Sequence, residues 1–223
     1  RSYLDVYDRY GLLVPRTVLA HGIWLNDADL ATLKERGGHI AFCPTSNQFL
    51  GSGSLDWHRT RSAGVPVSLA SDVGGGTSLS LRRTMLGAYQ VQAGLHQRVT
   101  AWALLHAATR GAAQALHLGH EIGGLAEGQM ADLCVWDWGT HPLALRRQSV
   151  ARDLHDRLFA WITSGDEADL AELHADIEQQ QRLNRIDVDD PQPLELVLDD
   201  IEQQPVQALD HRAVEQTVVG DDG

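Results

Sequence analysis

The sequence lacks the long apolar runs of a membrane protein and is poor in cysteine. Within its 223 residues no run of about 18 apolar residues occurs, so no transmembrane helix is expected. The two cysteines, Cys43 and Cys134, lie in separate apolar segments. Such a pair favours buried thiols in a reducing compartment over a disulfide framework, and a cytoplasmic location is therefore expected.

Negative charge is unevenly distributed, and the main body lacks a basic stripe. Residues 166–223 hold 17 acidic residues and three arginines, whereas the first 165 residues carry a net charge of +2. The near-neutral body argues against nucleic-acid binding. The terminal segment also lacks Phe, Trp and Tyr, so it can bury little apolar area. We expect an acidic, mobile tail there, with Leu170, Leu173 and Ile177 spaced to line one face of a single docked helix.

Three apolar segments each run into a polar group able to do chemistry. They are Thr17–Ala20 before His21, Ile40–Cys43 before Pro44-Thr45-Ser46-Asn47, and Val65–Ala70 before Ser71-Asp72. A helical pattern follows each segment, which predicts parallel strands with crossover helices. Catalytic groups of α/β barrels lie at the carboxyl ends of such strands. We therefore predict that the side chains of His21 and Asp72 converge on one space.

The pattern changes beyond Leu118. A helix capped by Thr100 and running toward Ala115 precedes the change, and a turn-rich stretch leads to the strand Asp132–Trp136, read as an antiparallel element. One more helix is expected over residues 150–163. The organisation predicted is a parallel α/β portion over 1–118, a strand and helix over 119–165, and the tail over 166–223.

The strand-end motifs resemble strands six, seven and eight of the amidohydrolase barrel, most closely those of guanine deaminases. The matching stretches run from Val18 to Gly22, from Ala41 to Gly53 and from Ser71 to Ser78. The later stretch 122–133 resembles the return of such chains into a small β-sandwich. The resemblance covers roughly residues 1–163. It implies the carboxyl-terminal part of a TIM-like (β/α)8 barrel, with a remnant of a β-sandwich and the acidic tail.

The resemblance also implies a zinc-dependent hydrolase that converts guanine to xanthine and ammonia. Asp72 would be a zinc ligand and a partner of the attacking water, and His21 would polarise that water without binding metal. Zinc chemistry of this kind works at neutral pH because the metal lowers the pKa of bound water from about 15.7 to near 7. The expected partner is a small purine substrate, with no nucleic acid or membrane, in a homodimeric parent protein.

Several family signatures are missing from the chain. None of its eleven histidines belongs to a His-x-His or His-x-x-Glu motif, and the purine-reading arginine is absent as well. Asp72 is then the one recognisable zinc ligand, and one carboxylate does not hold zinc. The chain opens with Arg1 inside a helical pattern, and we expect it to be a piece of a longer protein. By itself it should bind zinc weakly and show no deaminase activity.

Two alternatives remain open at this point. The parent protein could be another deaminase or a chlorohydrolase of the same superfamily, acting on a triazine or an adenosine-like ring. In a different class, the chain could be a non-catalytic module whose acidic tail binds a partner. A phosphate cradle at Gly74–Gly76 is not supported, because no Gly-Lys-Ser/Thr follows the glycines.

Overall fold

The computed structural model describes residues 2–165 and 167–174, so the predicted tail beyond residue 174 lies outside the described residues. The helices are α1 (Tyr3–Arg9), α2 (Asp27–Glu35), α3 (Pro44–Phe49), α4 (Trp57–Ser62), α5 (Leu81–Gly94), α6 (Ala101–Ala108), α7 (Arg110–Ala115), α8 (Pro142–Ser149) and α9 (Leu154–Ser164). The strands are β1 (Val18–Ala20), β2 (His39–Phe42), β3 (Val67–Leu69), β4 (Leu133–Trp136) and β5 (Leu170–His174). No helix in this described part of the chain is long and apolar enough to cross a membrane.

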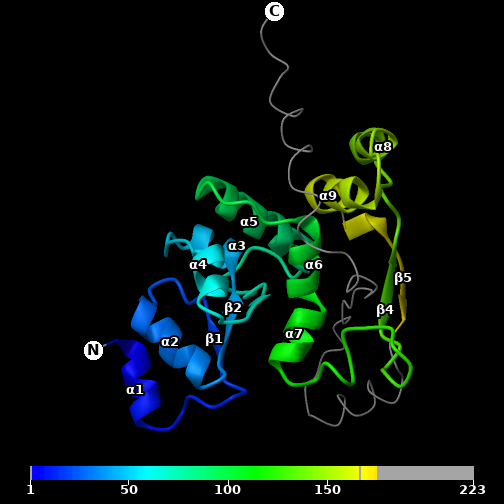
Figure 1. Ribbon diagram of the computed structural model, residues 1–223. Coiled ribbons are helices and arrows are strands. Elements are labelled where there is room, and N and C mark those ends of the chain that lie inside the picture. The colour runs from blue at the N-terminus through cyan, green and yellow to red at the C-terminus, as the bar shows by residue number, and fades with distance from the viewer. Residues whose placement is uncertain (1, 166, 175–223) are drawn as a thin grey trace, which may run out of the picture.

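The first three strands form one parallel sheet in the order β1–β2–β3 (Figure 1). Leu19 pairs with Ile40, and Ile40 pairs in turn with Val67. The predicted parallel strands are therefore confirmed. All of β3 is buried, and α6 and α7 pack against it. By contrast the edge strand β1 is only partly covered, and Val18 on it is 38% exposed.

Helix starts follow the capping signals in the sequence. The Asn26 side chain caps α2 by accepting from the backbone N–H of Asp29, whose carboxylate accepts from the Asn26 N–H in return. Thr100 caps α6, accepting from the N–H of Ala103. The predicted cap at Thr100 is confirmed. The reciprocal bonds between Asn26 and Asp29 satisfy backbone donors that the first helical turn leaves without partners.

Two local expectations were wrong. Residues 45–54 are polar and contain two glycines, a composition that predicts a loop, but the first part of this stretch lies in helix α3, because Pro44 at the first helical position presets the helical backbone angle. The single helix expected from Thr100 to Ala115 is divided at Thr109, whose φ of −124° and ψ of −102° separate α6 from α7. The backbone N–H of Thr109 bonds the carbonyl of His106, three residues back, so the regular ladder is broken there.

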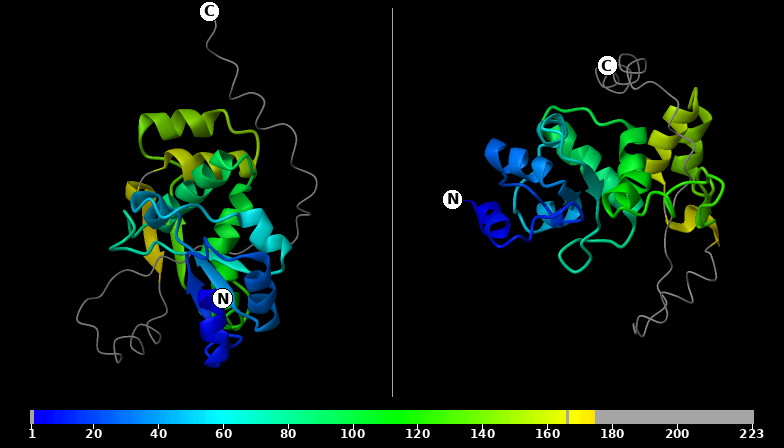
Figure 2. Two further views of the ribbon diagram at one scale, coloured as in Figure 1. Left: turned by 90° about the vertical axis from the view of Figure 1, so that its left-hand side faces the viewer. Right: turned by 60° about the horizontal axis from the view of Figure 1, so that its bottom comes forward.

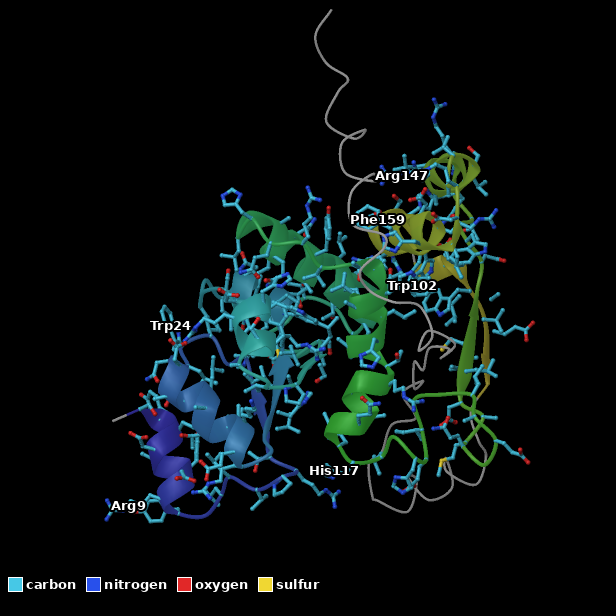
Figure 3. The ribbon with its side chains drawn as sticks, viewed as in Figure 1. Arg9, Trp24, Trp102, His117, Arg147 and Phe159 are labelled. Carbon is cyan, nitrogen blue, oxygen red and sulfur yellow. The ribbon has the colours of Figure 1, made fainter. Side chains whose placement is uncertain are left out.

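A continuous apolar core joins the parallel sheet to the later helices. Phe159 on α9 and Trp102 on α6 lie where these two helices meet (Figure 3). The ring of Phe159 packs edge-on against Tyr89 of α5, with 5.0 Å between centroids. Helix α9 is thereby fixed to α5 and α6, which confirms the predicted helix, although it begins at Leu154.

A second sheet pairs β4 with β5 in antiparallel fashion, and it lies with α8 and α9 at the end of the molecule opposite α1 (Figures 1 and 2). The antiparallel element predicted near residue 132 is confirmed. Its partner strand corrects the expectation for Leu170 and Leu173, which lie on a strand and not on a helix face. Backbone hydrogen bonds with β4 hold residues 170–174 in an extended conformation.

The segment before β5 is folded as well, although it falls within the stretch assigned to the tail. The short 3-10 helix η1 (Glu167–Asp169) leads into β5, and Asp169 is fully buried. Its carboxylate accepts from both the backbone N–H and the hydroxyl of Thr140, each at 2.7 Å. The average composition of residues 166–223 did not reveal this folded portion. Composition does not distinguish an acidic side chain that is a buried hydrogen-bond acceptor, as Asp169 is, from one at the surface.

Candidate metal and catalytic site

The polar residues that follow the three parallel strands meet at one edge of the sheet. His21 follows β1, Cys43 follows β2, and Asp72 lies shortly after β3. His21 Nε2 and Asp72 Oδ2 are 3.8 Å apart, although 51 positions separate the residues in sequence. The predicted convergence of His21 and Asp72 is confirmed by this distance. Their catalytic roles remain predictions.

Both of these residues have left-handed backbone conformations, with φ of 69° at His21 and 49° at Asp72. Such angles are uncommon for residues other than glycine and concentrate at functional sites. The N–H of His21 still bonds the carbonyl of Ala41 at 2.9 Å, so the sheet ladder holds the turn in place. Strand β1 therefore ends just before His21, and the left-handed turn changes the direction of the His21 side chain.

The glycines after Asp72 allow its turn to close tightly. The Asp72 carbonyl accepts from the N–H groups of both Gly75 and Gly76. A Cβ at Gly76 would lie 2.0 Å from the Ser71 carbonyl oxygen, and one at Gly75 would lie 3.0 Å from Asp72 Oδ2. Side chains at these two positions would push on the backbone or on the carboxylate itself. The glycine run is thus needed for the placement of Asp72.

Asn47 on α3 fixes the orientation of the His21 ring. Its amide oxygen lies 2.7 Å from His21 Nδ1, and Asn47 is almost completely buried. Because an amide oxygen only accepts, Nδ1 donates to it, and the neutral ring has the lone pair of Nε2 on the side of Asp72. The sequence motif included Asn47, but no role was derived for it. The sequence feature that could have suggested a role for Asn47 is its position about one helical turn after the end of strand β2.

Cys43 is the third group at this edge, and it was expected only as a buried thiol. One potential ligand atom from each of His21, Cys43 and Asp72 lies within 4.8 Å of the other two. Burial raises the pKa of the Cys43 thiol, the Asp72 charge raises it further, and a hydrogen bond with the His21 backbone opposes both effects. The thiol is therefore protonated at neutral pH in the protein without a bound cation.

The site is open on one side. The side chains of His21 and Asp72 are 39% and 38% exposed. A separate cavity of about 640 Å³ lies between α3 and α5, with Thr45, Phe49 and Gln90 among its lining residues. It is lined by none of the three site residues, so it is not the place where their chemistry occurs.

The donor set suits zinc by type, because imidazole nitrogen, thiolate sulfur and carboxylate oxygen are its three common protein ligands. Zinc sites in proteins are usually four-coordinate, with water completing a three-residue set in catalytic centres. The residues present at this edge therefore fit the metal that the sequence motifs implied.

Residues 1–179 match the amidohydrolase family. The chain belongs to that family. It is similar to the guanine deaminase of Escherichia coli, with 35% identity over 175 residues that cover 78% of this chain and 40% of the relative. It is also 42% identical over 139 residues to a probable guanine deaminase of Deinococcus radiodurans, covering 61% of this chain and 31% of that protein.

Solved structures agree with this assignment. The E. coli guanine deaminase structure matches with a TM-score of 0.76 and 34% identity, covering 78% of this chain and 41% of the other. An adenosine deaminase from Xanthomonas campestris with bound zinc matches with a TM-score of 0.64 and 27% identity, covering 77% and 38%. The predicted resemblance is confirmed, and the mixed α/β structure has the amidohydrolase fold. The chain spans about 40% of the length of its E. coli relative.

Proposed function

We propose that this chain is the carboxyl-terminal part of a zinc-dependent guanine deaminase, in which the whole protein hydrolyses guanine to xanthine and ammonia. One observation carries the proposal: His21 Nε2 and Asp72 Oδ2 are 3.8 Å apart at the carboxyl edge of parallel strands. The E. coli guanine deaminase matches 78% of this chain in both sequence and structure.

In this proposal β1, β2 and β3 are strands six, seven and eight of an eight-stranded barrel. The outer strand β1 leaves Val18 partly exposed, whereas parallel sheets in such proteins normally have both faces covered. The remaining strands of a longer protein would close the barrel and remove its edges. The sheet of β4 and β5 would then be the remnant of the small β-sandwich.

The roles of the chain's own residues follow from their atoms. A bound zinc ion, held by Asp72 together with donors from the rest of the barrel, would supply hydroxide at neutral pH. In its neutral form, the His21 ring would accept a hydrogen bond from the attacking water at Nε2, in an orientation fixed by Asn47. Asp72 accepts the water proton and delivers it to the departing amino nitrogen, which leaves as ammonia.

The separation between the two side chains suits this division of labour. At 3.8 Å, His21 Nε2 and Asp72 Oδ2 are too far apart for a direct hydrogen bond. Each atom is therefore available to a third atom lying between them, which is the position the reacting water requires. The 223-residue chain lacks the upstream motifs, so it should not turn over guanine without the remainder of the barrel.

An adenosine-like ring is the second candidate substrate. The similarity to the Xanthomonas adenosine deaminase favours it, at 27% identity against 34% for the E. coli guanine deaminase structure. A triazine chlorohydrolase and a non-catalytic module with a partner-binding tail are weaker alternatives. A homodimeric parent and a cytoplasmic location complete the proposal.

The test is a guanine deamination assay on the full-length protein, with adenosine as the competing substrate. Asp72→Asn should lower kcat by about 10²- to 10⁴-fold, the usual contribution of a proton-transferring side chain. Asp27→Asn on α2, whose side chain is 90% exposed, is the matched control and should retain activity. Faster turnover of adenosine, or full activity in Asp72→Asn, would contradict the proposal.

A further inference from the structure

Helices α8 and α9 expose apolar side chains at regular spacing. Leu143, Arg146 and Val150 follow one side of α8 and its C-cap, three and four positions apart. Leu154 and Arg157 are three positions apart at the start of α9, which packs against α8. All five side chains are exposed, and we name them the α8–α9 face. Apolar side chains that gather on a surface among charged ones are typical of a binding surface.

The α8–α9 face is also positively charged. Residues 142–157 contain four arginines and two aspartates, which gives a net charge of +2. One of the four, Arg152, pairs with Asp156 at 2.9 Å. The side chains of Arg146 and Arg157 make no ion pair with any residue that the structure describes. A partner for this face should therefore combine apolar side chains with negative charge.

The chain itself contains a segment with that complementary pattern. Residues 187–202, which lie outside the described residues, include seven acidic residues and no arginine or lysine. Four apolar residues of the segment have the spacing that lines one side of a helix: Leu194, Val197, Leu198 and Ile201. Glu195, Asp199 and Glu202 each follow one of these apolar positions, so the acidic positions repeat at the same interval.

We infer that residues 187–202 bind to the α8–α9 face of the same molecule. Their apolar positions would cover Leu143, Val150 and Leu154, and their acidic positions would lie beside Arg146 and Arg157. The inference goes beyond the proposed function, because the site at the carboxyl ends of β1–β3 takes no part in it. It also departs from the expectation of a wholly mobile tail, which composition alone suggested.

The connection is long enough for this contact. Strand β5 ends at His174, in the sheet that lies with α8 and α9 at one end of the molecule (Figures 1 and 2). Residues 175–193 then lead to Leu194, and an extended chain of that length reaches about 60 Å. Because such a tether gives an effective concentration of about a millimolar, contacts that are individually weak suffice.

Other occupants fit the charge less well. A twofold contact between two copies of the α8–α9 face would bring the arginines of both copies together, which like-charge repulsion opposes. Nucleic acid or an anionic membrane would match the arginines. However, the whole chain has a net charge of −12, which repels a polyanion. The acidic segment of the same chain therefore matches the face best.

The experiment is zero-length cross-linking of the 223-residue chain with a carbodiimide. Lys34 is the single lysine of the sequence, so Arg146→Lys keeps the positive charge of the face and adds an amine there. The carbodiimide activates a carboxylate, the lysine nitrogen attacks the activated carbon, and an amide forms as the carbodiimide leaves as a urea. Peptide mapping by mass spectrometry should locate this amide between position 146 and a carboxylate within residues 187–202.

Arg9→Lys on α1 is the matched control. Arg9 is also an exposed helical residue, and it lies far from Arg147 of α8, at the opposite end of the molecule (Figure 3). The yield of tail cross-links at position 146 should exceed that at position 9 by at least about tenfold, because binding holds the carboxylates beside the face. High salt should reduce the yield at position 146, since the paired charges are exposed.

Two further measurements test the intramolecular and the apolar parts of the contact. In a mixture of isotope-labelled and unlabelled chains, the cross-link should join residues of one chain at every protein concentration. Leu194→Ser combined with Leu198→Ser, in the Arg146→Lys chain, should lower the yield at least about fivefold by removing apolar contact. Equal yields at positions 9 and 146, cross-links between chains, or an unchanged yield in the serine variant would overturn the inference.

Discussion

The parallel sheet of β1–β3 and the antiparallel pair of β4 and β5 are specified by the sequence in different ways. In the parallel sheet, each strand is followed within three positions by the polar side chain it positions, as His21 follows β1 and Asp72 follows β3. In the second sheet, β4 pairs with β5, which begins 34 positions after β4 ends, and the buried residue Asp169 holds the start of β5 in place. The strands of the parallel sheet could be predicted because each strand and its polar residue are adjacent in the sequence. The pairing of β4 with β5 could not, because it depends on Asp169, a charged residue of the kind usually found at the surface.

The largest expected effect tests whether the two sheets are separable. Asp169→Ala removes a buried acceptor and leaves the N–H and hydroxyl of Thr140 without it, which should destabilise this part by about 3 kcal/mol. Hydrogen exchange should then show lost protection in β4 and β5 with little change in β1–β3. Glu127→Ala, at an exposed position, is the control. Equal loss of protection in both sheets would show that they unfold as one unit.

The same contrast sets the limits of sequence-based prediction. Strands ending at His21 and before Asp72 were predictable because apolar runs and their polar ends are adjacent in the chain. The position of Cys43 beside His21 and Asp72 was not, because a cysteine at the end of a buried strand has the same local signal whether or not a carboxylate from another strand lies near it. The division of the helix at Thr109 also depends on packing that no local pattern encodes.

A pH experiment tests whether the parallel sheet is stabilised by apolar packing alone. His39 on β2 is buried and its Nε2 lies 2.7 Å from the Ser68 hydroxyl. Burial, with a smaller contribution from the Arg61 charge, lowers its pKa from 6.5 to about 4. The unfolded chain therefore binds more protons between these values, and stability should fall as pH drops from 6.5 toward 4, by up to about 3 kcal/mol.

Urea unfolding at several pH values measures this dependence. His39→Gln should flatten the decline between pH 6.5 and 4, even if it lowers stability at neutral pH through imperfect packing. The comparison is made on the slope, which packing alone does not change. An unaltered slope in His39→Gln would assign the pH dependence to other groups.

A third experiment tests whether Asn47 orients the His21 ring or only contributes to the packing of α3. Asn47→Ala should leave the His21 ring without its acceptor and lower kcat for guanine deamination by the full-length protein by about 10- to 100-fold, less than the loss of a proton-transferring side chain itself. Asn47→Asp keeps an oxygen acceptor for Nδ1 and should restore most of the activity. If the alanine and aspartate variants are equally active, Asn47 supports only the packing of α3.

The smallest expected effect concerns the ion pair that joins the two regions at the surface. Arg83 on α5 donates from Nε and Nη2 to Glu167 of η1, both at 2.8 Å. The Arg83 hydrogen bonds lower the Glu167 pKa from 4.5 to about 2, against the opposing effect of partial burial. Its contribution to stability is present above pH 4.5 and is lost as pH falls from 4.5 toward 2.

The Glu167 side chain is 38% exposed, so solvent screening should reduce the neutral-pH effect of Glu167→Gln to below about 1 kcal/mol. A double-mutant cycle with Arg83→Gln isolates the pair, measured by urea unfolding at pH 7 and in high salt. A coupling that is small and salt-sensitive would leave Asp169 as the principal polar anchor of η1. A coupling above about 2 kcal/mol, unaffected by salt, would instead show that the surface pair fixes the second sheet to the first.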